Sequence, residues 1–303
     1  MMFQILENRE LVRGMLPLQP IIAPTMTAQG NSLVKTYHRR LGKERGTMQT
    51  ASLNSPIAWV GGKRQLRKYI VPLIPDDHKT YIEGFIGGAW VLFGKAPSET
   101  EVINDINGEL ANFWRVIKQR HEAFCKEMQY LFSSREIFSV LKDLDRCYLS
   151  EVVRAARFYY LNKNSFGARG INVGAGPGRH RTINFEKLEA NIEEVSRRIS
   201  HVLIEQLDFR QLIKKYDRPE TLFYLDPPYV DYPGCYEHDF TDRDHRDLAE
   251  LLHGLKGRFI LSYNNHPLIK QLYRGYKMKN LDTRYSLNDK GNKRVVELLI
   301  ANY

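Results

Sequence analysis

The sequence has few of the residues that build metal centres or disulfide frameworks. It contains three cysteines in 303 residues, Cys125, Cys147 and Cys235, and these lie far apart in the chain. An odd number of cysteines without close spacing argues against both a disulfide framework and a zinc knuckle. The nine histidines form no HxxxH spacing, and the one CxxH spacing, from Cys235 to His238, has no second pair of ligands nearby in the sequence, so we expect no metal site. The scarcity of cysteine fits a reducing, cytoplasmic compartment.

Long apolar runs and a surplus of acidic residues are lacking as well. No apolar run is long enough to span a bilayer, and acidic residues interrupt the first apolar stretch, unlike in a signal peptide. The chain has 45 Lys and Arg against 35 Asp and Glu, a net charge of +10. A basic balance of this size favours a polyanionic partner, nucleic acid first. Charge alone fits a merely soluble basic protein about equally well.

The composition changes after residue 54, which suggests how the chain is divided. Residues 1–54 mix Pro, Gln, Thr and Ser with a basic cluster at 37–43, so we predict a flexible N-terminal extension. Alternating strand and helix patterns occupy 55–120 and 195–303, where we expect one domain. The residues between these two parts, 121–194, show helical and loop patterns, and we predict that they form an insertion in that domain.

Hydrophobic spacing places the secondary-structure elements. The predicted strands are 81–85, 102–105, 202–205, 221–225, 258–262, 276–280 and 295–300. The predicted helices are 89–95, 110–131, 151–161, a segment near 212, one that follows a capping box at Thr241, and 267–272, while 163–187 is expected to be a hairpin or extended loop. Only a loop separates the last two strands, so they should pair antiparallel. The remaining alternation predicts an α/β fold with an open, mainly parallel sheet and helices on both faces.

Several unusual residues lie at the ends of predicted strands or shortly after them. They are the segment FIGG at 85–88, Asp105, Asp208 and Asp226. The carboxyl ends of parallel strands share one edge of a sheet, so we expect all of these residues on one rim, where such sheets bind ligands. A glycine pair at such a place lets backbone approach a ligand closely, although an ordinary turn is the alternative interpretation.

The ligand that this rim suggests is an adenosine without phosphates. The glycine turn matches neither GxGxxG nor GxxxxGK[ST], which argues against a dinucleotide or a nucleoside triphosphate. An acid at Asp105, after the second predicted strand, can accept hydrogen bonds from two ribose hydroxyls.

The sequence Asp226-Pro227-Pro228-Tyr229 ends the predicted buried strand 221–225. Turns favour Asp and Pro, so a stiff surface turn is one interpretation. The other is a platform for an exocyclic amine, whose lone pair is delocalised into its ring and must become pyramidal before it attacks a methyl group. The Asp226 carboxylate and the Pro227 carbonyl would accept the two N–H groups, in directions that the rigid prolines fix. Tyr229 would offer a face on which an extruded base stacks.

Five segments, taken in order, resemble the Dam-like (alpha-class, D12-type) N6-adenine DNA methyltransferases, which use S-adenosylmethionine. The segments are IAWVGGKR at 57–64, EGFIGG at 83–88, NDIN at 104–107, LDPPY at 225–229 and KRVVELLI at 293–300. The ordered set is far more specific than any one segment. The resemblance implies a Rossmann-like methyltransferase fold, in which the insertion 121–194 is a small target-recognition region.

The resemblance also implies roles for single residues. The contacts to the cofactor would be made by Trp59, Lys63, Phe85, Gly87, Asp105, Asp208, Phe209 and Asp226. The target amine would be served by Asp226, Pro227 and Tyr229. The alternatives are that Trp59 is a plain core residue, that Lys63 is a solvated helix start and that Asp208 is a helix cap.

Two parts of the chain depart from the family pattern. Ala89 and Trp90 stand where the family usually has a third glycine and a small hydroxyl residue. The basic segment 163–187 does not reproduce the arginine-bearing hairpin associated with GATC recognition, so the recognition sequence stays open. The candidate DNA contacts are Arg169, Arg179 and Arg181 in this segment and Lys293 in a second basic region, 270–294. Such side chains read guanine in the major groove or hold phosphates.

We therefore predict a site-specific DNA methyltransferase that requires no metal. It would flip adenine out of double-stranded DNA and transfer a methyl group in line from S-adenosylmethionine to N6. The same chemistry on RNA or on a protein amide is one alternative, and a non-catalytic DNA-binding module is another. Intact Asp105 and Asp226 argue against the module, because a pure binder does not need a cofactor rim. The oligomeric state stays open.

Overall fold

The computed structural model describes residues 53–165, 183–231, 240–285 and 293–303. Its strands are β1 (Thr80–Glu83), β2 (Thr100–Asn104), β3 (Leu203–Glu205), β4 (Thr221–Leu225), β5 (Arg258–Asn264), β6 (Lys277–Tyr285) and β7 (Lys293–Ala301). Its α-helices are α3 (Arg67–Ile70), α4 (Gly108–Met128), α5 (Arg135–Asp143), α6 (Glu151–Asn164), α7 (Phe185–Ile199), α8 (Phe209–Tyr216), α9 (Asp242–His253) and α10 (Pro267–Leu272). Short 3-10 helices are η2 (Val71–Leu73), η3 (Leu92–Gly94) and η4 (Arg146–Tyr148).

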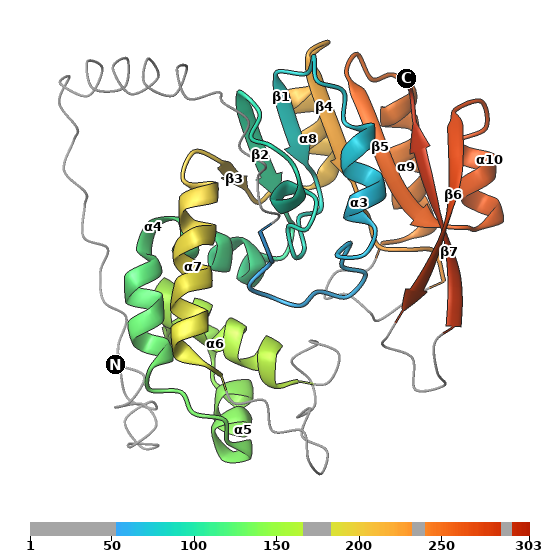
Figure 1. The fold of residues 1–303 in the computed structure, drawn as a ribbon. Helices are drawn as coiled ribbons and strands as arrows, with labels where there is room; N and C mark the ends of the chain where they lie inside the picture. Colours follow the sequence, from blue (N-terminus) through green and yellow to red (C-terminus); the bar gives the residue numbers. More distant parts are fainter. Residues whose placement is uncertain (1–52, 166–182, 232–239, 286–292) are drawn as a thin grey trace, which may run out of the picture. The chain divides into compact units, whose positions relative to one another are not determined.

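The strands of the described residues form one seven-stranded sheet in the order β3-β2-β1-β4-β5-β7-β6 (Figure 1). β1 to β5 run parallel, and β7 lies antiparallel between β5 and β6. The predicted α/β fold, with a mainly parallel sheet and an antiparallel C-terminal pair, is confirmed. The chain runs outward from β1 to β3 and then starts again at β4 on the other side of β1. Ligands bind at such switch points, beyond the carboxyl ends of the strands.

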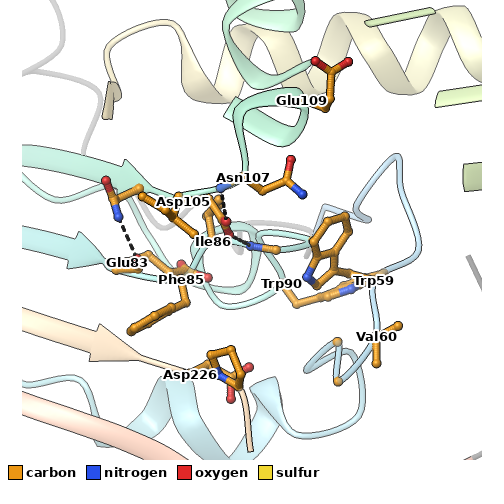
Figure 2. Close-up of a pocket in the computed structure, with 18 of the residues that line it drawn as sticks. Trp59, Val60, Glu83, Phe85, Ile86, Trp90, Asp105, Asn107, Glu109 and Asp226 are labelled. Carbon is orange, nitrogen blue, oxygen red and sulfur yellow. Dashed lines mark hydrogen bonds between the residues drawn. The ribbon is translucent and has the colours of Figure 1, made fainter. Parts of the chain in front are cut away.

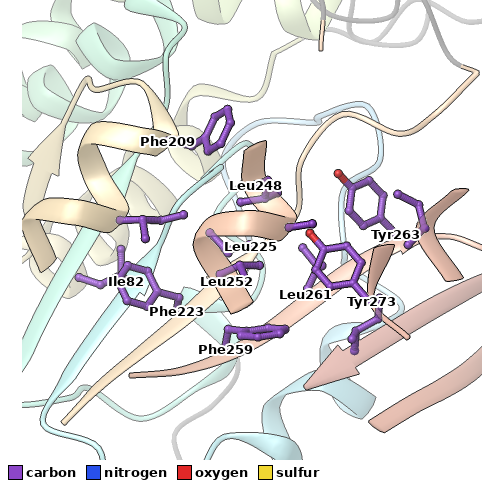
Figure 3. Packing of buried hydrophobic residues seen from close by; sticks show 14 of the residues in the cluster. Ile82, Phe209, Phe223, Leu225, Leu248, Leu252, Phe259, Leu261, Tyr263 and Tyr273 are labelled. Atoms are coloured by element: carbon purple, nitrogen blue, oxygen red, sulfur yellow. The ribbon is translucent and has the colours of Figure 1, made fainter. Parts of the chain in front are cut away.

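Apolar side chains bury both faces of the central strands. All five residues of β4 are buried, as expected for a parallel strand covered on its two faces. On one face Leu225 of β4 and Leu261 of β5 belong to the same cluster as Leu248 and Leu252 of α9 (Figure 3). The cluster extends to Phe209 of α8, so burial of this face fixes the helices that follow β3 and β4.

A second group of buried aromatic residues holds α4 against α6 and α7. Apolar residues of the predicted helix 110–131 are buried, with Phe113 and Trp114 fully so. The ring of Phe113 lies 5.1 Å from that of Trp114 and 6.1 Å from that of Tyr159 on α6. The predicted helix is therefore present and belongs to the core, although Arg120 has non-helical torsions and kinks α4.

Polar side chains set where the helices begin. Asn107 caps α4 by accepting a hydrogen bond from the Leu110 amide at 2.9 Å. The predicted capping box at the start of α9 is present, with Thr241 and Asp244 each accepting the other's backbone N–H. Such caps satisfy amide groups that have no partner inside a helix, so helix starts after the strands are well specified locally.

Two predicted elements are wrong. The helix expected at 89–95 is only the 3-10 turn η3, because Ala89 adopts a left-handed φ of 56°, which an α-helix excludes. The segment 163–187 is not wholly extended. α6 reaches Asn164 and α7 begins at Phe185, capped by Asn184; residues 166–182 lie outside the described residues. The helices α3, α5 and α7 were not predicted.

We expect Asn104, the last residue of β2, to be a main contributor to stability at the rim. Its buried amide donates to the carbonyls of Gly84 and Leu207 at 3.0 Å each and accepts from the Leu207 amide at 2.8 Å. Asn104→Leu leaves these backbone groups unpaired and should lower the free energy of unfolding by roughly 3 kcal/mol in urea denaturation. The control Asn191→Leu removes one exposed bond to Asn54 and should change it by less than about 0.5 kcal/mol.

Candidate active site

A cavity of about 620 Å³ lies at the carboxyl ends of β1, β2 and β4 (Figure 2). All eight residues predicted to contact a cofactor line it: Trp59, Lys63, Phe85, Gly87, Asp105, Asp208, Phe209 and Asp226. The expectation that Gly87, Asp105 and Asp226 share one rim is confirmed. The cavity is also lined by Lys142, Arg146 and Arg157, which belong to α5, η4 and α6, so residues from the range 121–194 contribute to its lining.

The turn after β1 brings backbone to the wall of the cavity. Gly87 has a φ of 45°, and a Cβ placed on it would lie 2.6 Å from Cδ1 of Trp59. Glycine is thus required at 87 for both the torsion and the space. Trp59 covers this turn and also contacts Phe158 of α6, with ring centroids 6.2 Å apart, so it joins the turn to α6.

Asp105, directly after β2, links the two turns that face the cavity. Its Oδ1 accepts a hydrogen bond from the Asn107 amide at 3.0 Å, and its Oδ2 accepts from the Gly87 amide at 3.4 Å. A carboxylate oxygen has two lone pairs and can accept more than one hydrogen bond. Asp105 is half-buried and lines the cavity.

Asp208 and Phe209 stand at the start of α8. Asp208 caps that helix by accepting from the Arg210 amide at 2.8 Å, and it pairs with the Arg210 guanidinium at 3.1 Å. The cap interpretation of Asp208 therefore holds, and a ligand contact remains a prediction. Phe209 belongs to an aromatic group with Phe85 and Phe240, at centroid distances of 5.3 to 6.2 Å. Such a group can receive a flat heteroaromatic ring.

Asp226 is the centre of a network of hydrogen bonds at the end of β4. Its Oδ2 lies 2.7 Å from Nζ of Lys63, and its Oδ1 accepts from the Ser262 hydroxyl at 2.8 Å. The Tyr229 hydroxyl lies 3.4 Å from the same Oδ1. The carboxylate is 18% exposed, and it lines the cavity together with Lys63.

The two charged groups beside Asp226, those of Lys63 and Glu297, are almost completely buried. Lys63 is 4% exposed and donates to the Gly61 carbonyl at 2.7 Å, and its Nζ lies 3.9 Å from the fully buried Glu297. Burial by itself lowers the pKa of Lys63, but the carboxylates of Asp226 and Glu297 outweigh it and raise the pKa above its ordinary value. Lys63 therefore stays charged at neutral pH and is not a solvated helix start.

Three polar residues at this site were not predicted: Glu83, Ser262 and Glu297. Glu83 lines the cavity at the end of β1, Ser262 lies on β5, and Glu297 lies on β7. A signal was present for Glu297, because a lone acid interrupts the apolar run VVELLI of a buried strand. Buried charges are rare unless they are paired, so such an acid indicates a partner elsewhere in the fold.

The remaining predicted residues are the four candidate DNA contacts and Pro227. Arg169, Arg179 and Arg181 lie outside the described residues, and Lys293 is the first residue of β7. Pro227 is buried and directly follows Asp226. Within the described ranges, no group of three or more His, Cys, Asp or Glu is placed to hold a metal ion. No helix of that part of the chain is long and apolar enough to cross a membrane.

The sheet, its switch point and the cavity beyond it define an α/β enzyme of the open-sheet class. The family described as D12 class N6 adenine-specific DNA methyltransferase matches residues 59–287. The chain belongs to this family, and the resemblance seen in the sequence is confirmed. It is a site-specific, adenine-specific DNA methyltransferase, and its reaction needs a methyl donor.

Relatives of similar length support this assignment. The chain is 30% identical to the Type II methyltransferase M1.LlaDCHI of Lactococcus lactis, over 81% of this chain and 94% of the relative. It is 28% identical to the Type II methyltransferase M.MjaIII of Methanocaldococcus jannaschii, over 82% and 98%. It is 22% identical to the DNA adenine methylase of Haemophilus influenzae, over 81% and 92%. The alignments thus extend over most of both chains.

The carboxyl of Glu83 should make stability depend on pH. Burial raises its pKa to about 8, against hydrogen bonds from Tyr81 and the Leu92 amide that lower it. Because the folded pKa lies above the unfolded value of 4.5, the contribution to stability is present below that value and is lost as pH rises toward 8.

We expect Glu83→Gln to flatten the fall in the free energy of unfolding between pH 4.5 and 8, measured by urea denaturation at a series of pH values. The control is Glu205→Gln. The hydrogen bond from Lys215 lowers the pKa of Glu205, so this substitution should leave the slope in that range unchanged. An unchanged slope in Glu83→Gln would show that its carboxyl is ionised in the folded protein.

Proposed function

We propose that S-adenosylmethionine is the methyl donor and that the cavity at the switch point binds it. When bound, this molecule supplies an electrophilic methyl group on a positively charged sulfur. The described residues fit it. Phe209 offers an apolar face for the adenine, and the Asp105 carboxylate lines the cavity for the ribose. Phe85 and Gly87 line the part that would receive the amino-acid end. Carboxylates of the rim suit its positive charge.

The target amine is held at the other side of Asp226. In this proposal adenine leaves the DNA stack and its N6 donates to the Asp226 carboxylate and to the Pro227 carbonyl. These two acceptors favour the pyramidal form of the nitrogen, whose lone pair then points at the methyl group. Asp226 need not be a strong base, because the methylated amine is acidic until it loses its proton. Tyr229 supports the base from the same rigid turn.

The observation that carries this proposal is the position of Asp226. Its carboxylate stands in the wall of the cavity that all the predicted cofactor residues line, and it directly precedes the two prolines that end β4. In this proposal the methyl donor and the target amine are both held next to Asp226. An in-line transfer requires the two reacting groups to be this close together.

We propose further that the basic segment 163–187 and the second basic region contact double-stranded DNA, through Arg169, Arg179, Arg181 and Lys293. The division into an extension (1–54), a catalytic domain (55–120 and 195–303) and a target-recognition insertion (121–194) belongs to this proposal. A bacterial or phage-infected cytoplasm is the setting that the relatives' sources support.

We expect label from tritiated S-adenosylmethionine to appear in double-stranded DNA, as N6-methyladenine after digestion, and not in RNA or protein. The reason is the family to which the chain belongs, together with an excess of basic residues that suits phosphate binding. Label confined to RNA or to protein would overturn the DNA assignment. Absence of cofactor binding by calorimetry would instead support a non-catalytic module.

Asp226→Ala should lower kcat by at least about a hundredfold, because an acceptor preorganised for the transition state is removed. The measurement is methyl transfer to DNA under single-turnover conditions. The control Asp77→Ala removes a carboxylate that also pairs with a cation, Arg258 at 2.7 Å. Asp77 precedes β1 and so lies at the opposite edge of the sheet, and its loss should leave kcat within about twofold. Normal transfer by Asp226→Ala would disprove the mechanism.

A further inference from the structure

Glu297 is a buried acid whose role the mechanism above does not explain. It is fully buried on β7, the antiparallel strand beside β5. Its Oε2 accepts a hydrogen bond from the Tyr229 hydroxyl at 2.9 Å, and its Oε1 lies 3.9 Å from Nζ of Lys63. Burying a carboxylate is costly unless it is paired, and Tyr229 and Lys63, with which Glu297 interacts, also contact Asp226.

The two carboxylates compete for the same donors. The Tyr229 hydroxyl has one proton to donate, and its oxygen is 2.9 Å from Glu297 but 3.4 Å from Asp226. The shorter distance assigns that proton to Glu297. Lys63 is likewise placed within reach of both acids, 2.7 Å from Asp226 and 3.9 Å from Glu297, and its charge is divided between them.

We propose that Glu297 is a positioning residue that keeps donors of the protein from occupying Asp226, so that this carboxylate can accept the N–H of the target amine. Glu297 holds the phenolic proton of Tyr229 and part of the charge of Lys63. Without it, both donors turn to the remaining carboxylate and fill its lone pairs. The same bond fixes the Tyr229 ring, whose centroid lies 5.1 Å from the Lys63 ammonium. This inference rests on the proposed roles of Asp226 and Tyr229.

Substitution of Glu297 by Gln tests the effect of its negative charge while keeping the size of the side chain. Gln keeps the volume and an oxygen that can accept from Tyr229, but it is neutral and a weaker acceptor than a carboxylate. We expect kcat for DNA methylation to fall on the order of tenfold, with KM for S-adenosylmethionine within about twofold, because the loss concerns the transition state of the amine. Thermal unfolding is measured in parallel to show that the variant is folded.

A double-mutant cycle with Tyr229→Phe gives a readout that a structural role would not move. Phe keeps the ring and removes the donor for which the acids compete. Glu297→Gln should therefore cost at least about threefold less in the Tyr229→Phe background than in the native chain. If Glu297→Gln does not fold, Glu297→Asp takes its place. It keeps the charge but is too short to hold Tyr229, and it should show the same coupling to Tyr229→Phe.

The matched control is Glu205→Gln at the end of β3. Glu205 has the same kinds of partner, Tyr216 at 2.5 Å and Lys215 at 2.7 Å, but they lie on α8, away from Asp226. The Glu205→Gln substitution should therefore leave kcat unchanged. A kcat of Glu297→Gln equal to that of the native chain, or equal losses in both Tyr229 backgrounds, would overturn the positioning role. If the native chain itself transfers no methyl group from S-adenosylmethionine, the proposed function fails, and this inference with it.

Discussion

The buried ion pair between Lys63 and Asp226 is the interaction on which the site depends. It joins a turn near the start of the described residues to the end of β4, and Ser262 of β5 and Glu297 of β7 complete its surroundings. Each of these charges would be costly to bury alone. Correct burial of any one of them therefore requires that the others are in place, and the pair commits distant parts of the chain to one arrangement.

The glycine turn after β1 is a second place where residues distant in the sequence depend on one another. Gly87 has the left-handed torsion and the missing side chain that allow Trp59 to lie against it, and Asp105 accepts from its amide. The turn, the tryptophan and the acid are thus fixed together on one side of the switch point. Asp226 and its partners are held by hydrogen bonds on the other side, and side chains held in this way on both sides favour a preorganised site.

Part of the site follows from local sequence. A strand that ends at Leu225 and is followed by Asp226 and two prolines can be recognised because the prolines stop the strand. The order of the motifs then identifies the family. The extent of η3 and the start of α7 did not follow, since Ala89 takes its left-handed torsion only in the context of the folded turn and α7 gains its stability from packing on α4.

The sequence by itself determined the alternation of strands and helices and the residues that form the rim, because these depend on residues close together in the chain. It also determined the basic charge, which depends on composition alone. Only the tertiary structure decided the partners. Glu297 reaches Lys63 and Tyr229 because β7 enters the sheet antiparallel beside β5. The order of strands is set by packing of whole faces. No spacing within the sequence predicts that Lys63 and Glu297 lie together in one buried site.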